Sequence, residues 1–158
     1  LWQAQVEDLL AQDTLLQSEV FGPLSLLVEV DDEAQLQAVV KALQGQLTAT
    51  VHAEADDGPL AASLLPLLCE KAGRVLFNGY PTGVEVCDAM VHGGPWPATT
   101  DARGTSVGSR AIERFLRPVC LQNAPAALLP PALQDANPLN LLRLVNGQWT
   151  REAISSSH

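Results

Sequence analysis

Between Leu24 and Asn78 the chain alternates strand-like and helix-like segments, and this alternation restricts its fold more than any other feature. The run Leu24 to Val30 (LSLLVEV) is almost continuously apolar, which is typical of a strand covered on both faces. The segments Leu47 to Ala53 and Arg74 to Asn78 are two further candidate strands. Strands separated by helices join in parallel through right-handed crossovers. The sequence therefore predicts an α/β fold, with a parallel sheet between helical layers.

The first intervening helix has a clear beginning and a clear apolar side. Asp31 and Asp32 are suitable N-caps, and Gln35 lies in the capping-box position three residues after Asp32. One apolar stripe follows at helical spacing, formed by Leu36, Val39, Val40 and Leu43. We expect Gly45 to end this helix in a left-handed conformation.

The second helix is expected over Leu60 to Ala72, with Pro59 in its first turn and Gly73 at its end. From Gly79 to Gly104 the chain has many glycines and prolines and no clear period, as in long functional loops. A short helix is expected over 106–116. An edge strand follows at 119–122, just after Pro118.

We therefore expect three regions: a main α/β region over residues 1–116, an association strand at 117–124 and a tail over 125–158. The tail ends in the polar string Ser155 to His158, where we expect fraying.

Charge and cysteine usage exclude several classes of function. The formal net charge of −9 disfavours binding to nucleic acid and to anionic membrane surfaces. No apolar run is long enough to span a bilayer, and the acidic first residues do not resemble a signal peptide, so a cytoplasmic location is expected. The three cysteines Cys69, Cys87 and Cys120 form no CxxC pair, so we expect reduced, buried thiols and no metal site.

Two sequence blocks carry a family resemblance. Residues 19–23 read EVFGP, and residues 73–125 contain the runs NGYPTGVEV, HGGPWPATTD, SVG and AIERFLRPV. Together these blocks resemble the C-terminal part of an aldehyde dehydrogenase. Within that superfamily they are most similar to the NADP-dependent dehydrogenases of 2,5-dioxopentanoate, or α-ketoglutaric semialdehyde. The resemblance runs from about residue 18 to residue 149, and it implies the three-layer catalytic subdomain of that fold with an edge-strand extension.

The resemblance implies a cofactor role for Glu19 and Phe21. Glu19 would accept hydrogen bonds from the two hydroxyls of the nicotinamide ribose, and Phe21 would pack beside the nicotinamide ring. A carboxylate suits this role because it offers several acceptor sites to two adjacent donors. From the pentapeptide alone, a local cap at Glu19 and a core position for Phe21 would be the better interpretation. The second block favours the cofactor role.

The same resemblance implies that residues 78–96 line the aldehyde tunnel. His92 lies where many relatives have an aromatic residue, and its imidazole would contact a dicarboxylic semialdehyde. A His92 ring satisfied by loop carbonyls is an equal alternative. Cys87 is the one cysteine with a chance of facing the substrate. We also expect this loop to form its site at the carboxyl end of the preceding strand, where open α/β sheets bind ligands.

Arg110, Arg114 and Arg117 fall on one helical side, where a basic group would help to hold an anionic substrate. Their spacing is also that of a solvated face with ion pairs to the excess acidic residues, which we favour.

The attacking thiolate of the family lies in a G-Q-x-C context upstream of E-x-F-G-P, and the general-base glutamate lies further upstream. Neither of these two contexts occurs in this chain, nor does a dinucleotide-binding unit. We therefore expect no catalytic residue here and an NADP or NAD site that this chain forms only in part. The residues that select between the two cofactors belong to the absent unit.

The expected function is that of a C-terminal fragment of an NAD(P)-dependent aldehyde dehydrogenase. Such an enzyme would oxidise a semialdehyde such as 2,5-dioxopentanoate to the acid, and the fragment alone would be inactive. By family analogy the segment at 117–122 joins the sheet of a neighbouring subunit, which implies a homo-oligomer. One alternative is a stand-alone association module derived from that family. Another is one half of a split enzyme whose partner polypeptide carries the cysteine.

Overall fold

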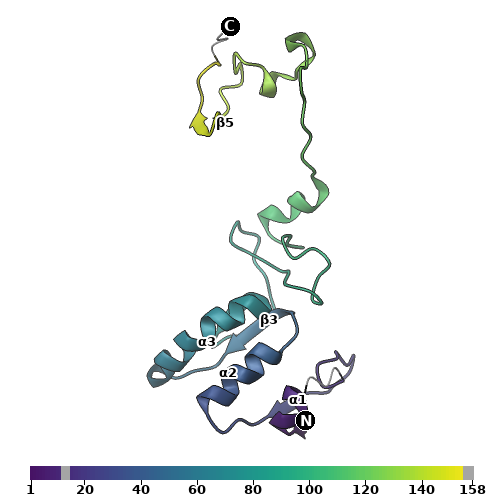
Figure 1. Ribbon diagram of the computed structural model, residues 1–158, viewed down its shortest axis with the longest axis vertical. Coiled ribbons are helices and arrows are strands. Elements are labelled where there is room, and N and C mark those ends of the chain that lie inside the picture. The colour runs from purple at the N-terminus through teal and green to yellow at the C-terminus, as the bar shows by residue number, and fades with distance from the viewer. Residues whose placement is uncertain (12–14, 155–158) are drawn as a thin grey trace. The chain divides into compact units, whose positions relative to one another are not determined.

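The computed structural model describes residues 1–11 and 15–154, so the expected frayed end at Ser155 to His158 lies outside the described residues. The chain divides into two compact units, 1–117 and 118–158, which are considered separately. The elements of the first unit (Figure 1) are β1 (Trp2–Ala4), α1 (Val6–Leu10), β2 (Leu26–Val28), α2 (Glu33–Ala42), β3 (Gln46–Val51), η1 (Ala55–Asp57), α3 (Gly58–Lys71), β4 (Ala72–Phe77) and η2 (Ser109–Phe115). None of the helices in the described ranges has the length and apolarity needed to cross a membrane.

The α/β class and the parallel pairing of strands are confirmed. β3 and β4 pair in parallel, with Gln46 opposite Ala72 and Val51 opposite Phe77. β2 pairs in parallel with β1, an element that the sequence did not predict, and not with β3. The strands of the first unit thus form two small parallel sheets within the described residues. The three-layer arrangement stays a prediction.

α2 begins as its sequence predicts. The carboxylate of Asp32 accepts a hydrogen bond from the backbone N–H of Gln35 at 2.8 Å. The side-chain oxygen of Gln35 accepts in return from the N–H of Asp31 at 2.6 Å, one residue earlier than in a standard capping box. This reciprocal pair satisfies two backbone donors at the helix start.

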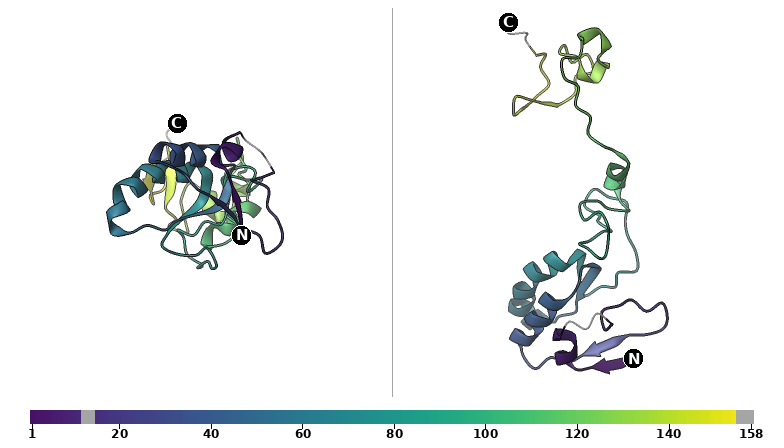
Figure 2. Two further views of the ribbon diagram at one scale, coloured as in Figure 1. Left: turned by 90° about the horizontal axis from the view of Figure 1, so that it is seen from below. Right: turned by 45° about the vertical axis from the view of Figure 1, so that its right-hand side comes forward.

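The apolar stripe of α2 joins two small cores. Val39 packs with α1 residues Val6 and Leu9, whereas Val40 packs with α3 residues Leu64 and Leu68. The second core also includes Ala49, Val51 and Val75, which places α2 and α3 on the same face of the β3–β4 pair. Figures 1 and 2 show the two helices running side by side. Full burial of such aliphatic side chains stabilises a fold by about 1.5–3 kcal/mol each.

The predicted roles of Gly45 and Gly73 as helix ends are wrong. α2 ends at Ala42 with Leu43 as an extended C-cap, and α3 ends at Lys71, so that Gly73 lies inside β4. Neither glycine has a positive φ. Both allow a close backbone approach instead. A Cβ at Gly73 would collide with the carbonyl oxygen of Gly93, and a Cβ at Gly45 would collide with the carbonyl oxygens of Pro95 and Trp96.

The long irregular stretch after β4 is confirmed. From residue 78 to residue 108 the chain forms only turns and bends. The helix expected at 106–116 is shorter and is a 3₁₀ helix, η2. Its apolar residues Ile112, Phe115 and Leu116 are exposed.

Residues 118–154 contain more structure than the tail that the sequence predicted. The elements are η3 (Ala126–Leu128), η4 (Pro131–Leu133) and an antiparallel hairpin of β5 (Arg143–Val145) and β6 (Gln148–Thr150) (Figure 1). The hairpin turns at Asn146 and Gly147, both with positive φ, which is the two-residue turn that Asn-Gly favours. The buried Asn137 amide holds Leu141 and Arg151 to one another. The segment 119–122 is not paired as a strand within the described chain.

The close approach at Gly73 makes a direct prediction for stability. The substitution Gly73→Ala would place a Cβ against the backbone of Gly93 and Gly94, so we expect a loss of about 1–3 kcal/mol in the free energy of unfolding. Gly58→Ala is the matched control, because nothing lies within 4 Å of its Cβ position and its backbone is helical. This control should be stabilising by about 0.4–1 kcal/mol. Equal effects of the two substitutions in urea denaturation would contradict the packing.

Candidate functional site

The segment carrying Glu19 and Phe21 is tightly turned and faces solvent. The N–H of Gly22 donates to the carbonyl of Val20, and the N–H of Leu24 donates to the carbonyl of Gly22, each at 2.8 Å. These are two successive three-residue turns, centred on Phe21 and Pro23. Phe21 is 94% exposed and Glu19 is exposed, so a core position for Phe21 is excluded within this chain.

Gln17 ties this segment to the end of α2. Its side-chain oxygen accepts from the N–H of Gln44 at 2.7 Å, and its side-chain nitrogen donates to the carbonyl of Ala42 at 3.3 Å. Both contacts join residues at least 25 positions apart in the sequence. They place the turn before Glu19 against the chain that leads from α2 into β3.

Glu19 lines an open hollow of about 580 Å³ at the amino end of β3. Its walls are Gln17, Ser18, Glu19, the segment 44–48, Pro97 and Ala98. The carboxylate is therefore not packed among aliphatic side chains, and acceptor oxygens are available to a ligand that enters the hollow.

His92 is held through its backbone. Its N–H donates to the hydroxyl oxygen of Thr105 at 2.9 Å, and that hydroxyl donates onward to the carbonyl of Val107 at 2.8 Å. The carbonyl of His92 accepts from both the N–H and the hydroxyl of Ser106. Thr105 is buried, which protects this network. The ring Nδ1 of His92 is buried and has no hydrogen-bond partner in the described part of the chain, so loop carbonyls do not satisfy it there.

His92 lines a second hollow, of about 400 Å³, together with Thr105, Ser106 and Arg114. This hollow shares Leu47, Pro97 and Ala98 with the Glu19 hollow, so the two adjoin. The contacts of Gly73 and Gly45 with residues 93–96 place this part of the loop at the amino ends of β3 and β4. The loop thus returns along the sheet from the carboxyl end of β4, and the position of a substrate site in this loop stays a prediction.

The cysteines take no part in either hollow. Cys87 is half-buried and lines neither of them, whereas Cys69 and Cys120 are exposed. The expectation that all three thiols are buried is therefore wrong for this chain. Among the described residues, no group of three or more His, Cys, Asp or Glu side chains is placed to hold a metal ion.

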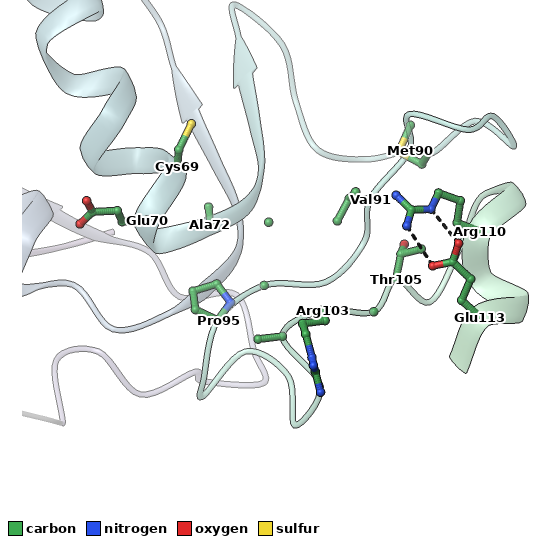
Figure 3. Close-up of a pocket in the computed structure, with 14 residues that line it drawn as sticks. Cys69, Glu70, Ala72, Met90, Val91, Pro95, Arg103, Thr105, Arg110 and Glu113 are labelled. Carbon is green, nitrogen blue, oxygen red and sulfur yellow. Dashed lines mark hydrogen bonds and ion pairs between the residues drawn. The ribbon is translucent and has the colours of Figure 1, made fainter. Parts of the chain in front are cut away.

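The arginines of η2 have different surroundings (Figure 3). Arg110 forms a two-pronged ion pair with Glu113, with Nε to Oε1 at 2.9 Å, and both side chains are exposed. This pair borders a third hollow, of about 410 Å³, that also contains Cys69 and Arg103. Arg103 points away from Arg110 in this view, so the two cations do not converge on one ligand. Arg114, by contrast, borders the His92 hollow.

Sequence reasoning missed Gln17 and Thr105, which hold residues of the two hollows, and it missed the structural role of Asn78 at the opposite end of the sheet. The Asn78 side chain pairs with both backbone groups of Ala53, donating at 2.9 Å and accepting at 2.8 Å. It thereby continues the β3–β4 pairing beyond the end of β4. Its φ of 50° is in the left-handed region, which asparagine tolerates, and an asparagine directly after a strand was a usable signal.

Comparisons with known proteins agree with the resemblance seen in the two sequence blocks. No family model matches the chain. It is 62% identical over 151 residues to an α-ketoglutaric semialdehyde dehydrogenase of Acinetobacter baylyi, which covers 96% of this chain and 29% of the relative. It is also 62% identical over 130 residues to α-ketoglutaric semialdehyde dehydrogenase 2 of Azospirillum brasilense, covering 82% of the chain and 25% of the relative.

The resemblance to aldehyde dehydrogenases is thus confirmed. Within that class, the chain is similar to a part of the α-ketoglutaric semialdehyde dehydrogenases. It spans less than a third of the length of these curated relatives.

The ion pair on η2 gives a measurable pH effect. The hydrogen bond and charge of Arg110 lower the pKa of Glu113, and Glu113 raises the pKa of Arg110. A carboxyl group with a lowered pKa in the folded state stabilises the fold above its ordinary pKa, and this contribution is lost as the pH falls through the folded-state value. NMR titration should show the pKa of Glu113 rising towards its ordinary value in Arg110→Gln, whereas Arg103→Gln should leave it unchanged. An unaltered Glu113 pKa in Arg110→Gln would contradict the ion pair.

Proposed function

We propose that this chain forms the part of an NAD(P)-dependent aldehyde dehydrogenase that contacts the nicotinamide ribose and the aldehyde substrate. The observation that carries this proposal is the meeting of two hollows at Leu47, Pro97 and Ala98. One hollow contains the exposed carboxylate of Glu19, and the other contains His92. A cofactor and a substrate that react with each other need neighbouring sites of this kind.

Glu19 fits the ribose of a nicotinamide cofactor. An exposed carboxylate at the rim of an open hollow can accept hydrogen bonds from two vicinal hydroxyls. Phe21, held at the tip of its turn, offers an apolar face beside the nicotinamide ring. The cofactor, when bound, supplies the hydride acceptor. This chain would hold one end of it, and we propose NADP, with NAD as the alternative.

The substrate side of the site is proposed to use His92. His92 lines the second hollow, and its imidazole would offer a polar contact to the oxygens of a semialdehyde such as 2,5-dioxopentanoate. Arg114 and Asp101 border the same hollow, and the guanidinium of Arg114 is the group there that could pair with the carboxylate of an anionic substrate. Cys87 lies outside both hollows, and its contact with the substrate stays a prediction from the family resemblance alone.

The attacking thiolate is proposed to come from outside these residues. Such a thiolate must lie beside the aldehyde carbon and the nicotinamide. None of the three cysteines borders the Glu19 or the His92 hollow. The chain alone should therefore lack dehydrogenase activity. All three cysteines are free, which supports a cytoplasmic location for the chain.

Binding of NADP⁺ to the chain tests the cofactor site. We expect weak binding, with a dissociation constant on the order of 1 mM, because one carboxylate and one ring hold only part of the ligand. Glu19→Gln should weaken binding at least about tenfold, since charge-assisted hydrogen bonds contribute about 1.5–3 kcal/mol. Glu29→Gln, a change of the same charge outside the hollow, should leave the affinity unchanged. Isothermal titration calorimetry that finds equal affinities for the two variants would contradict the proposal.

We also propose that the chain associates with copies of itself through the segment 117–124, and an association module is the second candidate function. Val119 and Leu121 are exposed, and the segment is not paired as a strand in the described part of the chain. Exposed apolar residues on an unpaired backbone favour strand addition to another sheet.

Analytical ultracentrifugation of two matched variants tests this association. Leu121→Asp should weaken self-association at least about tenfold, because a charge in an apolar interface costs more than 1.4 kcal/mol. Leu128→Asp introduces the same charge at another exposed leucine and should have no effect. Identical sedimentation of the two variants would contradict self-association through the segment 117–124.

A further inference from the structure

Gln17 uses both ends of its side-chain amide to close the end of α2. The carbonyl of Ala42 belongs to the last turn of this helix, where backbone acceptors lack intrahelical partners. Gln44 follows the extended C-cap Leu43, so its N–H also needs a partner outside the helix. The amide of Gln17 serves both groups, at 3.3 Å and 2.7 Å. It therefore replaces the glycine cap that the sequence led us to expect at Gly45.

We infer that Gln17 is a positioning residue for Glu19, and that it fixes the carboxylate of Glu19 at the wall of the ligand hollow. Gln17 and Glu19 are two residues apart and line the same hollow, together with Gln44. The same two hydrogen bonds that close α2 thus hold the start of the Glu19 turn. This inference rests on the proposed cofactor role of Glu19.

The surroundings of Glu19 show why such a tether is needed. Val20 and Phe21 are exposed, so apolar packing contributes little to the position of the turn. The hydrogen bonds of Gly22 and Leu24 shape the turn but stay within it. At its far end the segment is fixed by the N–H of Trp2, which donates to the carbonyl of Ser25 at 2.8 Å. Gln17, half-buried, provides a fixed point before Glu19, next to Ser18, whose N–H donates to the carbonyl of Leu15 at 3.2 Å.

The two hydrogen bonds of the Gln17 side-chain amide differ in length. The bond from Gln44 N–H to the Gln17 oxygen is short, whereas the bond from the Gln17 nitrogen to Ala42 is long. The acceptor half of the amide should therefore matter more. Gln17→Glu keeps this acceptor and loses the donor, whereas Gln17→Leu loses both at a similar side-chain size.

The test combines a cofactor-independent measurement with NADP⁺ binding to the full chain. By ¹⁵N relaxation, the order parameter of the Glu19 amide should be near that of rigid backbone, about 0.85, and should fall below about 0.6 in Gln17→Leu. Gln17→Glu should retain most of the order. Gln148→Leu, the same change at an exposed glutamine that lines neither hollow, should have no effect.

NADP⁺ titrations of the same variants give the coupling between the two residues. Gln17→Leu should weaken NADP⁺ binding at least about fivefold, and Glu19→Gln should then add little in the Gln17→Leu background, because the two residues act as one unit. Additive losses would overturn the inference, as would an unchanged Glu19 order parameter in Gln17→Leu.

The two failures can be told apart. If Gln17→Leu binds NADP⁺ as the original chain does while Glu19→Gln does not, Gln17 is not a positioning residue and the cofactor role of Glu19 stands. If Glu19→Gln has no effect on binding, the proposed function fails. The order parameter of the Glu19 amide then decides by itself whether Gln17 fixes the turn.

Discussion

The arrangement of the candidate site depends on one backbone contact, in which residues 93–96 lie directly on the amino ends of β3 and β4. This contact is possible because Gly45 and Gly73 have no side chains. A Cβ at either position would meet carbonyl oxygens of the loop, which are fixed backbone atoms and cannot swing aside. The contact turns a long irregular segment back along the sheet. It thereby brings His92 to the same end of β3 as Glu19.

The Glu19 segment and the His92 segment are then held by side chains that hydrogen-bond to the backbone of other parts of the chain. Gln17 ties the Glu19 turn to the end of α2, and Thr105 ties His92 to Val107. Asn78 continues the β3–β4 pairing at the opposite end of the sheet. These polar side chains serve backbone groups that helices and strands leave without partners. The two buried apolar clusters among the described residues contain few residues, so these polar contacts contribute much of what holds the site in place.

The local elements could be predicted from the sequence because their signals are local. The Asp32 cap and the stripe around Val39 and Val40 gave α2, and the parallel pairing of β3 with β4 followed from their separation by a helix. Gly45 and Gly73 were misassigned, because a glycine needed for a close approach looks the same in sequence as one that ends a helix. The Asn146–Gly147 hairpin had a local signal that was overlooked.

The candidate site could be predicted only in part from the sequence. Glu19, Phe21 and His92 came from the family resemblance, which the similarity to α-ketoglutaric semialdehyde dehydrogenases supports. Their common location could not be predicted, because it follows from contacts between residues far apart in the chain. Gln17 and Thr105 have no distinctive sequence pattern, since their roles depend on which backbone groups lie opposite them.

The contact of the loop with β4 can be measured directly by nuclear Overhauser spectroscopy on the chain. An ideal Cβ on Gly73 would collide with the carbonyl oxygen of Gly93 and lie 2.9 Å from the backbone nitrogen of Gly94, so the Gly73 α-proton on that side lies against the peptide between Gly93 and Gly94. A cross-peak between a Gly73 α-proton and the Gly94 amide proton is therefore predicted. If residues 87–108 show only sequential contacts, and none to Gly73 or Gly45, the shared site of Glu19 and His92 is contradicted.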